Sequence, residues 1–250
     1  MRMAICAAVL AAIFESSSVG AGVARNANFS VYVPDTSTPG QAQRFAELLL
    51  ERAEQYRTEI AKEWLGQELP AGAGRSTIYV EFSAAEDLGL TWAKDRPDRH
   101  SHTIWLNTSP RLAIGETLKH EVAHAVFATK YPHPHRLPSW VEEGIASRYD
   151  NEIRKDSRDQ RTRSWVRTGR AIRLEQMLGS SDMHSSDEYS YAAATSLVSF
   201  LLSRGDARSV MRFAEDGQRG GWDAALRAHY RIESLEELQT QWEAWLARQF

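Results

Sequence analysis

The sequence predicts an α+β fold: a small mixed β-sheet packed with a long helix, followed by an all-helical second half. Three observations carry this prediction. Alternation of apolar and polar residues at period two occurs only before residue 110. In the rest of the chain, apolar residues recur at spacings of three and four. The expected sheet lobe and the expected helical lobe are separated by Tyr131–Pro138, where three prolines exclude helix and predict a rigid connector.

The first 24 residues have the order of a secretory signal peptide. Arg2 is followed by an apolar run from Met3 to Phe14 and then by small residues, so cleavage is expected after Ala21 or Ala24. The apolar run is shorter than the roughly 20 residues that span a bilayer. We therefore expect an exported protein, periplasmic or secreted, with no integral membrane segment after cleavage. The only cysteine lies inside this segment, which leaves no disulfide in the processed chain.

Residues 25–250 are expected to form one domain, whose first lobe, residues 25–131, holds the sheet. Period-two runs predict strands at Asn28–Val33, Ser76–Phe82 and His102–Asn107. Helical spacing predicts helices from about Gln41 to Trp64 and from about Arg111 to Lys130, the second one starting at Ser109-Pro110. The polar stretch Ala84–Ser101, which contains a glycine and a proline, is interpreted as a long surface loop.

The second lobe, residues 132–250, is expected to be helical throughout. Ser234 and Glu237 have the spacing of a capping box at the start of the last helix. The predicted helices are about Trp140–Tyr149, an arginine-rich stretch ending at Arg167, Leu174–Leu178, Ser190–Ser203, Ala207–Asp216 and Leu235–Phe250.

The overall charge argues against one class of partner. The chain has 30 Lys and Arg against 33 Asp and Glu, so no basic surplus is available to bind a nucleic-acid backbone. We expect no nucleic-acid partner.

His120-Glu121-Val122-Ala123-His124 is an H-E-x-x-H motif within a predicted helix. Residues four apart lie one turn apart on the same helix face, so both imidazoles can reach one metal ion. Glu121 projects from the same turn and can reach a water on that ion. The pattern predicts a zinc site in which Glu121 is the catalytic base.

A catalytic zinc site needs a third protein ligand and an open position for water. Glu142 and Glu143 on the next predicted helix are the candidates. Ser139 and Glu142 have the spacing of a capping box, which assigns Glu142 to helix capping and leaves Glu143 for the metal.

Eighteen residues separate His124 from Glu143, and Trp140-x-x-Glu143-Gly144-x-Ala146 surrounds the third candidate. Both features resemble the gluzincin branch of the H-E-x-x-H zinc peptidases, in particular the catalytic domain of the zinc aminopeptidases. The resemblance implies a thermolysin-like fold and one catalytic zinc ion held by His120, His124 and Glu143. It also implies an oxyanion-donating tyrosine, which we assign to Tyr191, with Tyr189 as the alternative. The G-x-M-E-N motif with which that family binds a free amine is missing between Arg96 and Asn107.

The sequence therefore predicts an exported zinc metallopeptidase acting on a peptide or protein, as an endopeptidase or a peptidase of narrow specificity rather than an aminopeptidase. The alternative is a catalytically silent protein of the same fold that serves as a binding or scaffold module of the cell envelope. Retention of Glu121 beside all three candidate ligands favours the enzyme, because a silent descendant has no chemical need for the base.

Overall fold

The computed structural model describes residues 22–249 except 36, 37, 39, 97, 98, 181, 182 and 184–186. Most of the predicted signal peptide therefore lies outside the described residues. Its last three residues, 22–24, belong to a β-strand, so cleavage after Ala24 would remove most of that strand and cleavage after Ala21 would leave it whole. Among the described helices, none combines the length and apolar character needed to cross a membrane.

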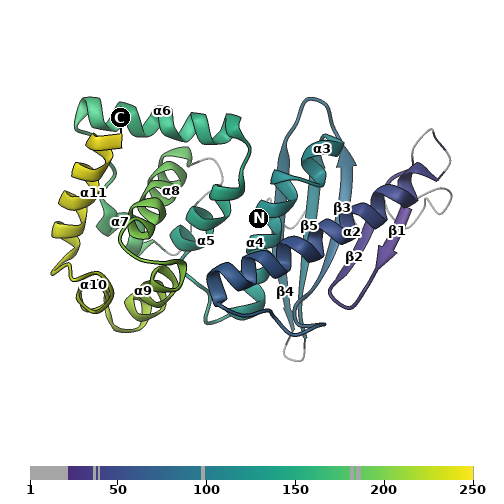
Figure 1. Ribbon diagram of the computed structural model, residues 1–250, viewed down its shortest axis with the longest axis horizontal. Helices are drawn as coiled ribbons and strands as arrows, with labels where there is room; N and C mark the ends of the chain where they lie inside the picture. Colours follow the sequence, from purple (N-terminus) through teal and green to yellow (C-terminus); the bar gives the residue numbers. More distant parts are fainter. Residues whose placement is uncertain are drawn as a thin grey trace.

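Five strands form one mixed sheet in the order β1-β2-β3-β5-β4 (Figure 1). Strands β2, β3 and β5 run parallel, and the edge strands β1 and β4 are antiparallel to their neighbours. The strands are β1 (Gly22–Arg25), β2 (Phe29–Val33), β3 (Arg75–Phe82), β4 (Leu88–Arg96) and β5 (Arg99–Thr108). The mixed sheet predicted for the first half is thereby confirmed, with two strands more than expected.

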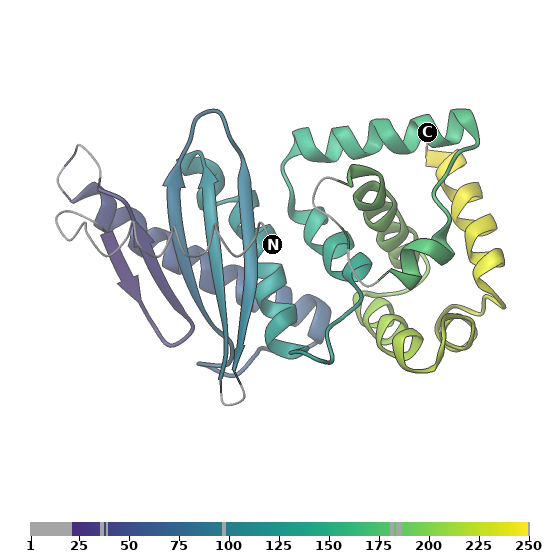
Figure 2. The same cartoon turned by 180° about the vertical axis from the view of Figure 1, so that it is seen from behind.

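Helices cover one face of this sheet. Figures 1 and 2 show α2 (Gln41–Ile60) crossing the sheet and α4 (Glu116–Lys130) lying over the β5 and β4 side. Val31, Ile78 and Ile104, which are neighbours across three strands, are fully buried beneath these helices. A short π-helical turn, η1 (Ala61–Leu65), extends α2 toward the second half of the chain. Lys119 of α4 pairs with Glu59 of α2 at 2.8 Å.

The prediction of a surface loop over Ala84–Ser101 was wrong. Half of this stretch is strand β4, which pairs with β5 along its whole length, and its last three residues belong to β5 itself. Its apolar residues Leu88 and Leu90 point away from the helices and are about half exposed, whereas Gly89 and Thr91 point toward α4. The inner face of β4 meets a polar site and not the apolar core. The alternation of buried apolar and exposed polar residues that predicts a strand is therefore missing.

The single helix predicted over Arg111–Lys130 is divided in two. The start is as predicted, because Ser109 caps α3 (Pro110–Ala113) and Pro110 occupies its first turn. The helix then breaks at Ile114 and Gly115, and α4 begins anew at Glu116.

The second half is helical, as predicted, and includes one helix, α10, that the sequence did not indicate. Ser234 accepts the Glu237 amide as predicted, but the Glu237 carboxylate bonds the amide of Glu233 and not that of Ser234. The elements are α5 (Ser139–Ala146), the 3-10 turn η2 (Ser147–Tyr149), α6 (Glu152–Thr168), α7 (Leu174–Gly179), α8 (Glu188–Leu202), α9 (Ala207–Gly220), α10 (Trp222–Tyr230) and α11 (Leu235–Gln249).

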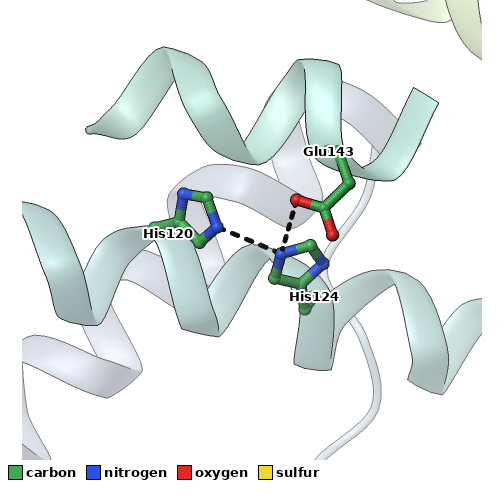
Figure 3. A group of neighbouring side chains, drawn as sticks. All are labelled: His120, His124 and Glu143. Atoms are coloured by element: carbon green, nitrogen blue, oxygen red, sulfur yellow. Dashed lines mark hydrogen bonds and ion pairs between the residues drawn. The ribbon is translucent and has the colours of Figure 1, made fainter. Parts of the chain in front are cut away.

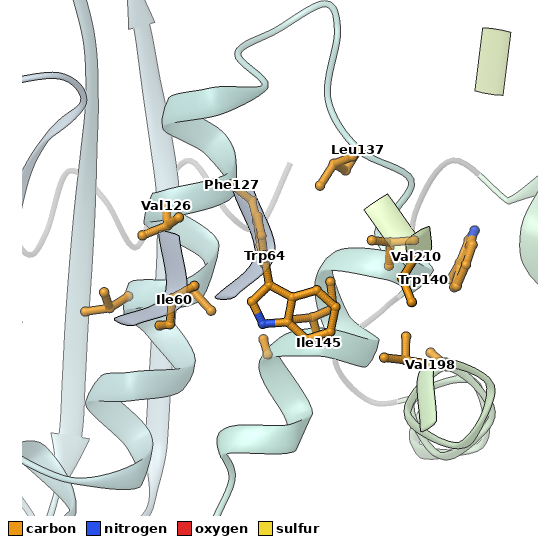
Figure 4. Packing of buried hydrophobic residues seen from close by; sticks show 14 of the residues in the cluster. Ile60, Trp64, Val126, Phe127, Leu137, Trp140, Ile145, Val198 and Val210 are labelled. Carbon is orange, nitrogen blue, oxygen red and sulfur yellow. The ribbon is translucent and has the colours of Figure 1, made fainter. Parts of the chain in front are cut away.

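The hydrophobic core continues from the sheet half into the helical half. Figure 4 shows Trp64, from the end of the first helical layer, packed beside Ile145 of α5, with Trp140 on the far side of that helix. The indole of Trp64 donates to the Tyr149 hydroxyl, which in turn donates to Glu63. Helices α4 and α5 are thus fixed to each other by a shared core, and both contribute side chains to the site described next.

Candidate metal centre

His120 and His124 lie one turn apart on α4, as the spacing predicts (Figure 3). Their Nε2 atoms face each other at 3.2 Å. The opposite side of the helix packs into the core through Leu118, Val122 and Val126, which are almost fully buried. Burial of the aliphatic face fixes the rotation of α4 and directs both imidazoles to the side where α5 approaches.

Glu143 of α5 completes the group. One of its carboxylate oxygens, Oε2, lies 3.6 Å from Nε2 of His124. Among the described residues, His120, His124 and Glu143 form the only group of three such side chains whose ligand atoms all lie within 4.8 Å of one another. The structure thus brings together the three ligands that the sequence predicts.

The capping box that was used to choose between the two glutamates was wrong. Pro138 occupies the N-cap of α5, and its carbonyl accepts the amides of Val141 and Glu142. Ser139 is already helical and caps nothing. Glu142 is partly buried, and burial raises the pKa of its carboxyl to about 7, with His124 opposing the shift and Glu143 adding to it. Capping does not distinguish the two glutamates, but only Glu143 belongs to the group of three candidate ligands.

The donor set fits a zinc ion. Two nitrogens bound to one tetrahedral zinc at about 2.1 Å would be about 3.4 Å apart, close to the observed 3.2 Å. Oε2 of Glu143 is buried and has no hydrogen-bond partner. A buried carboxylate oxygen without a hydrogen bond is costly unless a cation compensates it. Two imidazoles and one carboxylate are also the ligand types that catalytic zinc sites use.

Asp150 is the residue at the candidate site that sequence reasoning missed. It is almost fully buried, and its Oδ1 lies 3.0 Å from Nδ1 of His120. This contact fixes the ring so that Nε2 faces Glu143's side of the site. The other carboxylate oxygen pairs with Arg158, and Arg154 lies 3.5 Å from Oδ1. The only sequence signal for Asp150 is its position one turn after the end of α5, the helix that carries Glu143.

The charges around His120 act in opposite directions. Burial alone would lower the pKa of His120, but the Asp150 carboxylate outweighs burial and raises this pKa to about 9. Burial would raise the pKa of Asp150, but His120 and the two arginines hold it well below its usual range. Ser147, four residues after Glu143, would be another candidate to support an imidazole, but it is buried and its hydroxyl makes no hydrogen bond. Asp150 has that role for His120.

Glu121 follows His120 on α4, and its side chain is almost fully buried. Its carboxylate lies against the edge strand β4, with Oε2 2.7 Å from the Thr91 hydroxyl oxygen. Its negative charge adds to the raised pKa of His120 and of Tyr191. The predicted base is thus held between α4 and β4, one residue after the first candidate ligand.

Of the two tyrosines, Tyr191 reaches the site. Burial and the negative charge of the Glu143 carboxylate raise the pKa of Tyr191 far above its usual range. Tyr189 lies two residues earlier on α8, is 56% exposed, and stacks on Trp165. The side chains diverge because residues two apart point to different sides of a helix.

Comparison of the chain with protein-family models finds no match, and comparison with curated proteins finds none either. Its function has to be inferred from the chemistry of the site.

Proposed function

We propose that this chain is an exported zinc-dependent metallopeptidase of the gluzincin type, with residues 25–250 as one catalytic domain of thermolysin-like architecture. The observation that carries the proposal is the convergence of the ligand atoms of His120, His124 and Glu143 within 4.8 Å, with the buried Glu121 on the same helix as the two histidines. A structural zinc site closes with four protein ligands, whereas three ligands and an adjacent carboxylate are typical of hydrolytic centres.

Zinc bound by these three residues would supply an acidified water and a Lewis acid for the scissile carbonyl. Glu121 accepts a proton from the attacking water and transfers it to the departing amine, so the base is restored after each cycle. The phenol of Tyr191 donates a hydrogen bond to the oxyanion that develops on the carbonyl oxygen. Asp150 keeps His120 in the tautomer whose Nε2 lone pair faces the metal.

A peptide or protein is the substrate class that this arrangement favours, and no G-x-M-E-N motif is present to select a free amino terminus. We therefore propose cleavage of internal or otherwise restricted peptide bonds. Export follows from the signal-like first 24 residues and remains part of the same proposal.

The test combines metal content with cleavage of a mixed peptide library. The purified protein is expected to hold one zinc per chain, to cleave peptides, and to lose this activity with a chelator. Glu121→Gln should keep its zinc and lose about 10²- to 10⁴-fold in kcat, the usual effect of removing a general base. Glu81→Gln, an exposed carboxylate on β3, is the matched control and should behave as wild type.

Three results would contradict the proposal in different ways. Absence of stoichiometric zinc would exclude the metal site itself. Stoichiometric zinc without cleavage of any library peptide would favour the silent scaffold of the cell envelope. Full activity in Glu121→Gln would leave a hydrolase that uses another base.

A further inference from the structure

The edge strand β4 meets α4 at Glu121. Gly89 and Thr91 of β4 are opposite Leu106 and Ile104 of β5, whose side chains are buried under α4. The inner face of β4 therefore points at the helix that carries the predicted base. At this place the strand presents a glycine and a threonine, neither of which adds to the apolar core.

The hydroxyl of Thr91 contacts Glu121 twice. Oγ1 lies 2.7 Å from the carboxylate oxygen Oε2 and 3.1 Å from the main-chain carbonyl oxygen of the same residue. The shorter contact is a donated hydrogen bond to a buried carboxylate, which is stronger than one between neutral groups. A single side chain thus fixes the Glu121 carboxylate relative to its own backbone.

Gly89 leaves the space that the carboxylate occupies. A Cβ atom at this position would lie 2.6 Å from Cγ and 2.7 Å from Cδ of Glu121, which is closer than carbon atoms tolerate. Any other residue would have to displace Glu121 or the strand. Both inward positions of β4 therefore act on the Glu121 carboxylate: Thr91 contacts it, and Gly89 leaves room for it.

The beginning of β4 is fixed as well. Asp87, just before the strand, accepts hydrogen bonds from Thr108 of β5, Thr117 of α4 and Asn151 next to α6. It also pairs with Arg154 of α6. These four contacts hold the strand against α4 independently of the Thr91–Glu121 contact, so loss of the Thr91 hydroxyl should not release β4.

We propose that Thr91 is a positioning residue that sets the rotamer of Glu121. This inference rests on the proposed function, in which Glu121 is the base. The Thr91 hydroxyl donates to Oε2 at 2.7 Å and lies 3.1 Å from the Glu121 carbonyl oxygen, so it holds the carboxylate in one orientation on α4.

The kinetic test compares Thr91→Val, Thr91→Ser and Thr103→Val. Valine keeps the shape and removes the hydroxyl, so kcat should fall about 10- to 100-fold with KM nearly unchanged, as expected for a lost hydrogen bond to a charged group. Serine restores the hydroxyl and should recover most of kcat. Thr103→Val makes the same change on β5, on the sheet face turned away from α4, and should leave both constants unchanged. Zinc content should be equal in all variants.

A second readout does not depend on activity. In crystal structures of the metal-free protein, the Glu121 carboxylate of Thr91→Val should leave its wild-type position, whereas that of Thr91→Ser should keep it. An unmoved carboxylate in Thr91→Val, or a kcat equal to wild type in an active protein, would overturn the role of Thr91 and leave the proposed function intact. If wild type binds no zinc, the proposed function fails, while the crystallographic comparison still decides whether Thr91 positions Glu121.

Discussion

Asp150→Asn should weaken zinc binding and destabilise the metal-free protein by separate mechanisms. Asparagine preserves the size of a side chain that is 1% exposed and keeps an oxygen close to Nδ1 of His120. The negative charge that supports the imidazole is lost. Removing such a partner of a metal-bound histidine costs about 10- to 100-fold in affinity, or about 1.4–2.8 kcal/mol.

The cost in stability comes from the arginines. The Arg158 side chain is 13% exposed and forms an ion pair with the Asp150 carboxylate. Removing one member of a buried ion pair leaves the other charge uncompensated, at a cost of about 3 kcal/mol. Arg154 is affected less because Asp87 also pairs with it. We therefore expect Asp150→Asn to be less stable than wild type without metal. Added zinc should also stabilise Asp150→Asn less than it stabilises wild type.

The assay is competition for zinc with a chromophoric chelator at neutral pH, together with urea unfolding of the metal-free protein. Asp216→Asn is the matched control, since Asp216 also contacts a histidine, His229 at 2.7 Å, but lies on the surface in the α9 and α10 region. It should change zinc affinity by no more than about twofold, as exposed pairs contribute little. Equal zinc affinity in Asp150→Asn and wild type would refute the orienting role of Asp150.

Three further outcomes follow from the site and its surroundings. Glu143→Gln should lower zinc affinity at least about 100-fold, whereas Glu142→Gln should stay close to wild type, because a single buried oxygen at position 143 completes the ligand set. The same chelator competition measures both variants. Equal effects on zinc affinity would contradict the choice of Glu143 as the ligand. Tyr191→Phe should reduce kcat about 10²- to 10³-fold at unchanged zinc content, with Tyr189→Phe as a silent control, and a full kcat in Tyr191→Phe would remove the phenol from the mechanism. The hydrogen bond from Lys119 holds the pKa of Glu59 below its usual 4.5, so its stabilising contribution is present above pH 4.5 and is lost as pH falls through the lower folded value. In urea unfolding, Glu59→Gln should therefore cost about 0.5 kcal/mol at neutral pH and progressively less in acid, and a cost that does not change with pH would count against the ion pair.

The part of the site that the sequence predicted is the part encoded by local periodicity. The two histidines and Glu121 are fixed by helical spacing alone, and the structure places the imidazoles as expected. Glu143 is brought to them by the packing of α5, which the spacing of eighteen residues does not itself explain. The reason offered for preferring Glu143 was wrong, because Pro138 had already taken the cap that the sequence assigned to Ser139.

The parts that could not be predicted depend on contacts distant in sequence. Strand β4 has its apolar residues on the exposed side because its inner side faces Glu121, so its pattern indicates a loop when read without the helix. Asp150 carries no local motif, and its meaning arises only where the chain returns to within 3.0 Å of His120. Polar contacts of this kind depend on the tertiary structure, whereas apolar periodicity can be read from the sequence before the tertiary structure is known.

Gly144 shows how one residue of the ligand motif depends on such packing. A Cβ at this position would lie 2.7 Å from the Ala194 carbonyl oxygen and 2.8 Å from a methyl group of Val198, so α5 and α8 approach as closely as they do only over a glycine. Glu143 is the preceding residue on α5, and Tyr191 lies one turn before Ala194 on α8. The close approach of the two helices therefore sets the separation between the third ligand and the phenol. The glycine that follows the candidate ligand thus controls the distance between the two helices that carry Glu143 and Tyr191.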